Sequence, residues 1–350
     1  MTLDGHLIAG RGAFDLDCTL NAVPGSVVAL LGPNGAGKTT VLRALAGLTP
    51  LSAGHLRLGE RLLEDPRQQV RVTAQERRVG MVFQDRLLFP HLNVLDNVAF
   101  GPHHRGASRR ASRRTAREWL ERTGLVEFAS RRPHQLSGGQ QQRVAITRAL
   151  ATAPDLLLLD EPLAAIDAAA VVELRRFLRQ HISDFPGITV LVTHQSVDAL
   201  VLADQVLVLD AGRTVQSGSP VEVARRPRTS HVAALMGLNL LRGQAEGGVI
   251  HLGEGHLAVG AGHAAGEVLV SFSPSAVTLH SHRPDSSARN TWPGRIDGIA
   301  PHGDAVRVHV SGPVPVLADV TPRALTALSL AEGDSVWVAV KAVEVSVYPA

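Results

Sequence analysis

"SVVALLGPNGAGKTTVLRALAGL", residues 26–48, is the stretch that decides the fold. Its first apolar residues predict a buried strand, and an apolar helical pattern closes it. Between them, residues 32–39 match G-x-x-x-x-G-K-[ST] in the strand–loop–helix setting that this pattern requires. Glycines let backbone N–H groups surround phosphate oxygens, and the start of the helix adds partial positive charge. The stretch therefore predicts a phosphate-binding loop in an α/β domain.

Lys38, within this loop, is one of only two lysines in the chain, and Lys341 is the other. The chain has 35 Lys and Arg residues in total, so arginine replaces lysine almost everywhere else. A compact ammonium suits the outer phosphates of a nucleotide better than the planar guanidinium fork does. Lys38 is therefore predicted to bind phosphate, with the Thr39 hydroxyl as a ligand of Mg²⁺.

Polar residues also follow three other apolar runs, which are "RRVGMVFQD" (77–85), "PDLLLLDEP" (154–162) and "GITVLVTHQ" (187–195). The carboxyl ends of parallel strands gather at one edge of a sheet, where ligands bind. Gly32, Gln84, Asp160 and His194 are therefore predicted to converge. Asp160 is placed to hold Mg²⁺ through water, and Glu161 to polarise an attacking water.

"LSGGQQQRVAITRAL", which starts at Leu136, predicts a second helix that begins with a possible anion site. Ser137 is a good N-cap, and the two glycines after it free the backbone. With the motifs above, this stretch makes residues 1–230 resemble the ATP-binding-cassette (ABC) ATPases, whose signature is LSGGQ. The resemblance implies a head-to-tail homodimer in which each ATP lies between one chain's phosphate loop and the other's signature.

The resemblance also implies a role for each matching residue. The ATP-binding residues would be Gly32, Pro33, Asn34, Gly35, Ala36, Gly37, Lys38, Thr39 and Thr40, with Phe14 as the candidate for stacking on adenine or, alternatively, a core residue. The signature residues, which would touch the partner's ATP, are Leu136, Ser137, Gly138, Gly139 and Gln140. Glu161 would be the general base, His194 the switch histidine, Gln84 the lid glutamine, and Asp167 the acid of the dimer-interface loop. Mg²⁺ would be held by Thr39, Gln84 and Asp160. One departure is Ala164, where the family usually has serine.

A helical subdomain is expected at about residues 86–135. It contains the basic run "RGASRRASRRTAREWLERTGL", residues 105–125, which is either a solvated face or part of a surface that grips a membrane subunit. A nucleic-acid partner is not expected, because the formal net charge is only +3 and aromatic residues make up 3% of the chain.

Near residue 230 the sequence changes to short alternating segments separated by Gly, Pro and Asp. This pattern predicts an all-β, OB-like barrel after the α/β domain. Residues 231–286 are expected to be a connecting segment with the first barrel strands, and residues 287–350 the barrel itself.

Two segments of this barrel, "SSARNTWPGRI" (286–296) and "VAVKAVEVSV" (338–347), resemble the molybdate/tungstate-binding (Mop/TOBE-type) barrel found on the ATP-binding subunits of molybdate importers. The resemblance implies an oxyanion site made by Ser287, Ala288, Arg289, Asn290 and Lys341. A tetrahedral dianion needs such hydroxyl, amide and cationic donors. Ala342 stands where relatives often carry serine. The alternative is a dimerisation or spacer module with an exposed Lys341.

Cys18 is the single cysteine, which excludes an internal disulfide and fits a reducing compartment. We expect no signal peptide, no membrane-spanning run and no structural metal bound by the scattered histidines.

Together these features predict the ATPase of an ABC importer for molybdate or tungstate, using ATP and Mg²⁺, peripheral on the cytoplasmic face of the membrane. Its partners would be separate permease subunits and, indirectly, an extracytoplasmic molybdate-binding protein. The nearest alternatives are importers of sulfate, polyamines or ferric iron. Two other classes are an oxyanion-binding regulatory module that carries a cassette, and a soluble ABC ATPase acting on nucleic acid or ribosomes.

Overall fold

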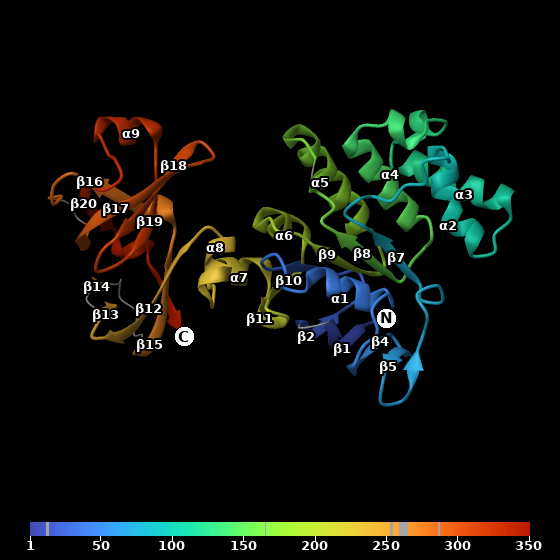
Figure 1. Ribbon diagram of the computed structural model, residues 1–350, viewed down its shortest axis with the longest axis horizontal. Helices are drawn as coiled ribbons and strands as arrows, with labels where there is room; N and C mark the ends of the chain where they lie inside the picture. Colours follow the sequence, from blue (N-terminus) through green and yellow to red (C-terminus); the bar gives the residue numbers. More distant parts are fainter. Residues whose placement is uncertain (12–13, 165, 253–254, 259–264, 286–287) are drawn as a thin grey trace. The chain divides into compact units, whose positions relative to one another are not determined.

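A computed structural model describes the chain except residues 12–13, 165, 253–254, 259–264 and 286–287. The chain forms two compact units, Met1–Pro220 and Val221–Ala350 (Figure 1). Among the described residues, no helix combines the length and apolar character that crossing a membrane requires.

The first unit is built on one sheet with the strand order β6-β5-β4-β1-β2-β11-β10-β3-β9-β8-β7. Its parallel part comprises β3 (Val27–Leu31), β7 (Val79–Val82), β8 (Leu156–Asp160), β9 (Ile188–Val192) and β10 (Gln205–Asp210). Every residue of β3, β8 and β9 is buried. Strands covered on both faces carry continuous apolar runs, so the predicted parallel α/β core is confirmed.

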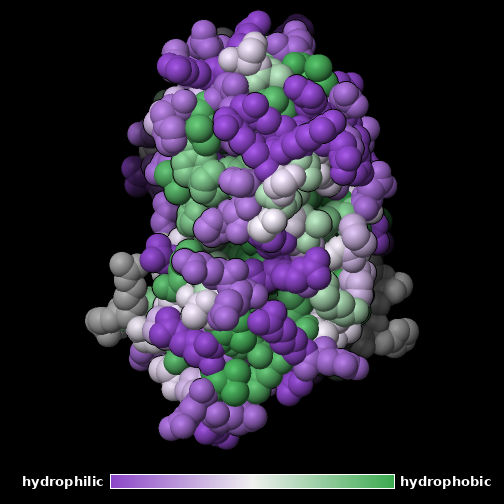
Figure 2. Space-filling view, turned by 90° about the vertical axis from the view of Figure 1, so that its right-hand side faces the viewer, coloured by the Kyte–Doolittle hydropathy of each residue, from purple (hydrophilic) through white to green (hydrophobic). Residues whose placement is uncertain are grey.

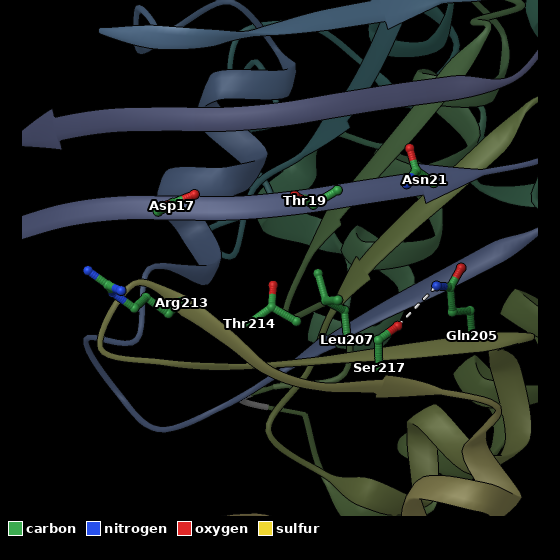
Figure 3. A pocket seen from close by; sticks show the side chains of 8 residues that line it. All are labelled: Asp17, Thr19, Asn21, Gln205, Leu207, Arg213, Thr214 and Ser217. Atoms are coloured by element: carbon green, nitrogen blue, oxygen red, sulfur yellow. Dashed lines mark hydrogen bonds between the residues drawn. The ribbon is translucent and has the colours of Figure 1, made fainter.

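The other strands of this sheet are β1 (Leu3–Arg11), β2 (Phe14–Ala22), β4 (Ala53–Leu58), β5 (Arg61–Asp65), β6 (Val70–Arg71) and β11 (Arg213–Gly218). Antiparallel pairing joins β2, β1, β4, β5 and β6 in succession. The two parts of the sheet meet where β11 pairs with β2 at one position, Arg213 opposite Asp17. Beyond it the strands leave a polar cavity of about 450 Å³. Figure 3 shows its lining residues, Asp17, Thr19, Asn21, Gln205, Leu207, Arg213, Thr214 and Ser217.

The helices of the first unit are α1 (Lys38–Leu45), α2 (Val94–His104), α3 (Arg109–Arg122), α4 (Gly138–Leu150), α5 (Ala168–Ser183) and α6 (Ser196–Leu202), with short 3₁₀ turns η1 (Val126–Phe128) and η2 (Pro133–Gln135).

Helices α2 and α3 occupy the range expected for a helical subdomain and share their own hydrophobic cluster. Arg113 of α3 donates two hydrogen bonds, of 2.8 and 2.9 Å, to the carboxylate of Asp96 in α2. The basic run forms α3, which buries Ser112, Ala116 and Leu120 at helical spacing. Figure 2 views the side of the molecule where these helices lie, and hydrophilic residues cover much of its upper part.

The second unit contains two five-stranded sheets, with the orders β14-β13-β12-β15-β21 and β16-β20-β17-β18-β19. The first comprises β12 (Asn239–Glu246), β13 (Val249–Leu252), β14 (Gly255–Ala258), β15 (Gly266–Phe272) and β21 (Ser346–Pro349). The second comprises β16 (Val277–His280), β17 (Asn290–His302), β18 (Ala305–Ser311), β19 (Val316–Val320) and β20 (Ser335–Val340). The helical segments are α7 (Pro220–Arg225), which spans the boundary, α8 (Ser230–Leu235), α9 (Pro322–Ala327), η3 (Pro274–Ala276) and η4 (Ala342–Glu344). One hydrophobic core joins the two sheets, so the predicted all-β domain is confirmed.

The boundary between the units lies at Pro220, rather than near residue 230 as in the division drawn from the sequence. The hydroxyl of Tyr348 in β21 donates a 2.6 Å hydrogen bond to the carbonyl of Pro227. Because β21 also pairs with β15, the last residues of the chain hold both the first strands and residues 221–230 in the second unit.

Candidate nucleotide site

Four neighbouring parallel strands, β3, β9, β8 and β7, direct their carboxyl ends to one edge of the sheet. The residues at these ends are Gly32 after β3, His194 after β9, Asp160 and Glu161 at the end of β8, and Gln84 after β7. The four apolar runs therefore gather their polar ends on adjacent strands, which is the arrangement that the sequence predicts.

A cavity of about 410 Å³ lies at the phosphate-binding loop. Its lining residues are Phe14, Asn34, Gly35, Ala36, Gly37, Lys38, Thr39, Thr40 and Glu161. The structure thus brings the aromatic candidate Phe14 and the acid Glu161 to the same cavity as the loop. Gly32 and Pro33 contribute carbonyls, which accept hydrogen bonds of 2.8 and 2.9 Å from Lys38 Nζ.

Two glycines of the loop cannot carry a side chain. Gly32 has φ 147°, and a Cβ there would lie 2.2 Å from the carbonyl oxygen of Leu209. Gly37 has φ 102°, and a Cβ there would lie 2.7 Å from Cζ of Phe14. The loop can therefore press against β10 and Phe14 only because both positions are glycine.

Lys38 and Asp160 are almost fully buried and oppositely charged. Burial lowers the pKa of Lys38, while Glu161 and Asp160 act against that shift. Burial raises the pKa of Asp160, and the neighbouring Glu161 raises it further, against a hydrogen bond from Thr39 and the charge of Lys38. The site thus holds two carboxylates that repel each other beside one cation.

These donors fit a magnesium ion. The Thr39 hydroxyl contacts the Asp160 carboxylate, so two hard oxygen donors lie side by side at the loop. No group of three or more His, Cys, Asp or Glu that could hold a metal occurs among the described residues. Mg²⁺ commonly binds one or two protein oxygens and completes its shell with water and substrate phosphates.

Glu161 turns the chain sharply at the end of β8. Its backbone is left-handed, with φ 45°, a conformation that costs a non-glycine residue on the order of 1 kcal/mol. Its N–H donates a 3.0 Å hydrogen bond to the carbonyl of Val192 in β9. This turn brings a carboxylate oxygen of Glu161 to 3.6 Å from Nδ1 of His194.

Sequence reasoning missed the residues that hold the turn containing His194. The Thr193 hydroxyl donates to Asp198 at 3.0 Å and accepts from the N–H of Gln195 at 3.1 Å. Asp198 is buried and also accepts a 2.6 Å hydrogen bond from Arg175 of α5. The available signal was an acid in the first turn of the helix that follows His194.

The signature residues form the start of α4. Ser137 and Gln140 make a capping box, in which the Ser137 hydroxyl accepts from Gln140 N–H at 3.3 Å and the Gln140 side chain accepts from Ser137 N–H at 2.9 Å. Leu136 is buried beside them. The described residues that line the phosphate-loop cavity do not include residues 136–140. They do not include Gln84 either, which is exposed.

Asp167 begins the neighbouring helix α5, where its carboxylate accepts a 3.0 Å hydrogen bond from the N–H of Ala170. A Cβ on Gly139 would lie 3.3 Å from Cβ of Ala170. The starts of α4 and α5 are therefore in contact, and the structure brings Asp167 to the signature rather than to the phosphate loop.

The expected oxyanion residues gather at one end of a sheet in the second unit. Ser287 lies outside the described residues, while Ala288 and Arg289 directly precede β17. Asn290, the first residue of β17, is buried and pairs with Val340 of β20. Lys341 follows Val340 and is exposed. The structure thus places Asn290 at the start of β17 and Lys341 directly after the neighbouring strand β20.

Comparison with known proteins agrees with this arrangement. The family model described as ABC transporter matches residues 16–164, and the TOBE domain model matches residues 286–347. The molybdenum import ATP-binding protein ModC of Mycobacterium tuberculosis is 41% identical, over 96% of this chain and 94% of its own length. The sulfate/thiosulfate import ATP-binding protein CysA of Photorhabdus laumondii is 41% identical, over 84% of this chain and 80% of its own length.

A solved structure is also similar. The ATP-binding cassette MJ0796, a dimer in a post-hydrolysis state bound to ADP and phosphate, aligns with a TM-score of 0.53 and 30% identity, over 63% of this chain and 99% of its own. The residues, the fold and these relatives lead to one family: the chain belongs to the ABC transporter ATPases, as an importer-type ATP-binding subunit with a C-terminal TOBE domain.

Proposed function

We propose that this chain is the ATP-hydrolysing subunit of an importer for molybdate or tungstate. The observation that carries the proposal is the extent of the similarity to the molybdenum import protein, which spans 96% of the chain and therefore both units. The sulfate/thiosulfate import proteins match 84% or 70% of the chain, which makes sulfate the second candidate cargo.

ATP would bind at the phosphate-loop cavity, with its phosphates on the loop N–H groups and Lys38 and its base near Phe14. Glu161 would act as the general base toward the attacking water, since it lines this cavity. His194, 3.6 Å away, would orient the Glu161 carboxylate and contact the terminal phosphate. Mg²⁺, held by Thr39 and Asp160 and by Gln84, which follows β7, would supply positive charge to the phosphates.

Two copies of the chain would form a head-to-tail dimer. The signature residues and Asp167 lie together at the starts of α4 and α5, while the cavity is lined by other residues of the chain. A partner could therefore use its own signature to cover the ATP bound here. The dimeric MJ0796 structure, with ADP and phosphate, supports this arrangement for a relative.

The dimer would drive separate permease subunits at the cytoplasmic face of the membrane, with an extracytoplasmic binding protein as an indirect partner. The helical subdomain, α2 and α3, is the proposed contact with the permease. The oxyanion would be held in the second unit by Lys341, Asn290, Arg289, Ala288 and Ser287. Asn290 begins β17, and Lys341 directly follows the adjacent strand β20.

Calorimetry of the full-length protein with molybdate, tungstate and sulfate tests the assignment. We expect molybdate and tungstate to bind more tightly than sulfate, and Lys341→Ala to weaken binding at least tenfold. Arg323→Ala, which removes another exposed cation from the second unit, is the matched control and should bind normally. Preferential sulfate binding would favour the second candidate, and no binding at millimolar molybdate would contradict the oxyanion site.

A further inference from the structure

The segment that follows Gln84 has an unusual backbone. Arg86 and Leu87 are consecutive non-glycine residues in the left-handed region, with φ of 63° and 46°. Each costs on the order of 1 kcal/mol, and such a conformation persists only where surrounding contacts hold it. Two such residues in a row indicate that the tertiary structure imposes the path of this segment.

Arg148, in the last turn of α4, supplies those contacts. It donates hydrogen bonds of 2.8 Å to the carbonyl of Leu87 and 3.1 Å to the carbonyl of Arg86. Its guanidinium also lies 5.3 Å from the ring centre of Phe89. Burial lowers the pKa of Arg148, yet an arginine stays charged at neutral pH, so these hydrogen bonds are charge-assisted.

The side chain of Arg86 consequently points to the signature of its own chain. Its Nη2 lies 3.4 Å from the position that a Cβ on Gly138 would take, with Cζ at 3.8 Å and Nη1 at 3.9 Å. Gly138 is the first residue of α4, directly after Ser137. Arg86 is not among the described residues that line the phosphate-loop cavity of this chain. The cation therefore lies at the signature and not at the chain's own phosphate loop.

We propose that Arg86 contacts the terminal phosphate of the ATP bound by the partner chain, and so makes dimer closure selective for ATP over ADP. This inference rests on the head-to-tail dimer proposed above, in which the signature covers the partner's nucleotide. A guanidinium binds two phosphate oxygens in parallel, and ADP lacks the phosphate that Arg86 would reach. Hydrolysis and phosphate release would remove this contact and weaken the dimer.

The test uses full-length protein carrying Glu161→Gln, which should hold ATP without hydrolysing it. ATP-dependent dimerisation is measured by analytical ultracentrifugation for this parent and with Arg86→Gln, Arg86→Lys or Leu87→Gln added. We expect Arg86→Gln to raise the dimer Kd at least tenfold and Arg86→Lys to restore part of the loss. Leu87→Gln, which alters the exposed neighbour without removing charge, should behave like the parent.

ATP affinity of the monomer is measured in parallel, by displacement of a fluorescent nucleotide at protein concentrations well below the dimer Kd. It should be the same with and without Arg86, because the contact is made across the dimer. A loss of monomer affinity equal to the loss of dimer affinity would overturn the inference, as would an unchanged dimer Kd in Arg86→Gln. A parent that fails to dimerise with ATP would instead remove the proposed dimer, and the role of Arg86 with it.

Discussion

Nδ1 of His194 lies 3.6 Å from a carboxylate oxygen of Glu161, and the two residues follow the adjacent parallel strands β9 and β8. The hydrogen bond from Glu161 N–H to Val192 ties the turn after one strand to the end of the other. The relative position of the two turns is therefore set by the sheet.

Glu161→Gln is expected to lower kcat for ATP hydrolysis by at least a hundredfold, because the amide cannot accept the proton of the attacking water. ATP affinity should change by less than about threefold, since the glutamine fills the same space. Steady-state turnover and equilibrium nucleotide binding are the measurements. Glu173→Gln, on an exposed position of α5, is the control and should retain normal turnover. Retention of a tenth of the activity by Glu161→Gln would contradict the general-base role.

Alanine substitutions at two loop glycines should differ strongly. At Gly32 a Cβ would lie 2.2 Å from the Leu209 carbonyl, so the loop must move and ATP affinity should fall at least a hundredfold. At Gly35 the backbone also has positive φ, 81°, but no heavy atom lies within 4 Å of the added Cβ. Gly35→Ala should therefore cost only about 1 kcal/mol of backbone strain and retain most of its ATP binding. Equal losses in the two variants would show that crowding against β10 does not set the loop's path.

Asp160→Asn is expected to stabilise the nucleotide-free protein while abolishing the extra stability that Mg²⁺ with ATP confers. The pKa of Asp160 is raised in the folded chain, so the folded state binds this proton more tightly than the unfolded state. At pH values above the folded pKa, the ionised carboxylate therefore lowers the free energy of unfolding. This destabilisation disappears as the pH falls through the folded pKa towards the ordinary pKa of an aspartate. Asparagine removes the charge at every pH.

Thermal unfolding across pH checks this prediction. At pH 7 the Tm of nucleotide-free Asp160→Asn should exceed that of the original protein by a few degrees. For a unit of this size, each kcal/mol gained in the free energy of unfolding raises the Tm by about 2–4 °C. The difference should narrow as the pH is lowered towards 4. A lower Tm for Asp160→Asn at pH 7 would show that the attraction of Lys38 outweighs burial and repulsion by Glu161.

The sequence predicts those features of the site that depend on local patterns. Apolar runs identify the buried strands, and the polar residue at each run's end is necessarily at the sheet edge once the strands are parallel. The positions of Asp160 and His194 at this edge could therefore be predicted without a structure. The left-handed backbone of Glu161 and Arg86 could not be predicted, because glutamate and arginine carry no such preference and distant contacts impose it.

Long-range pairing explains the other differences. The segment after Pro220 belongs to the second unit, and the hydrogen bond from Tyr348 to Pro227 connects it there across more than a hundred residues of sequence. The composition changes near residue 230, but the first strand of the second unit, β12, begins only at Asn239. Residues 221–238 before it already belong to the second unit. Likewise, Arg77 is one of many arginines in the sequence, and only the structure distinguishes it as fully buried.

Arg77 joins the end of α1 to β5. Its Nη2 donates a 2.5 Å hydrogen bond to the buried carboxylate of Glu64, and its Nη1 donates to the carbonyls of Ala44 and Leu45 at 2.8 and 3.0 Å. Arg77→Met removes the closest cation from the buried Glu64 carboxylate, which keeps only the more distant Arg71, at 3.9 Å, and the hydrogen bond from Leu51 N–H. The substitution should therefore lower the free energy of unfolding by about 3–5 kcal/mol.

Adding Glu64→Leu to Arg77→Met should recover part of that loss, because the pair is then replaced by apolar side chains. The hydrogen bond from Leu51 N–H to Glu64 and those from Arg77 to the carbonyls of Ala44, Leu45 and Val72 remain unreplaced. Urea unfolding of the original protein, both single variants and the double variant gives the coupling energy directly. One contrary result is that Arg77→Met lowers the free energy of unfolding by less than about 1 kcal/mol, and another is that the loss in the double variant equals the sum of the two single losses. Either result would mean that the ion pair does not hold α1. Since α1 begins at Lys38 and Thr39, a large coupling would tie the stability of this pair to the position of the phosphate-binding loop.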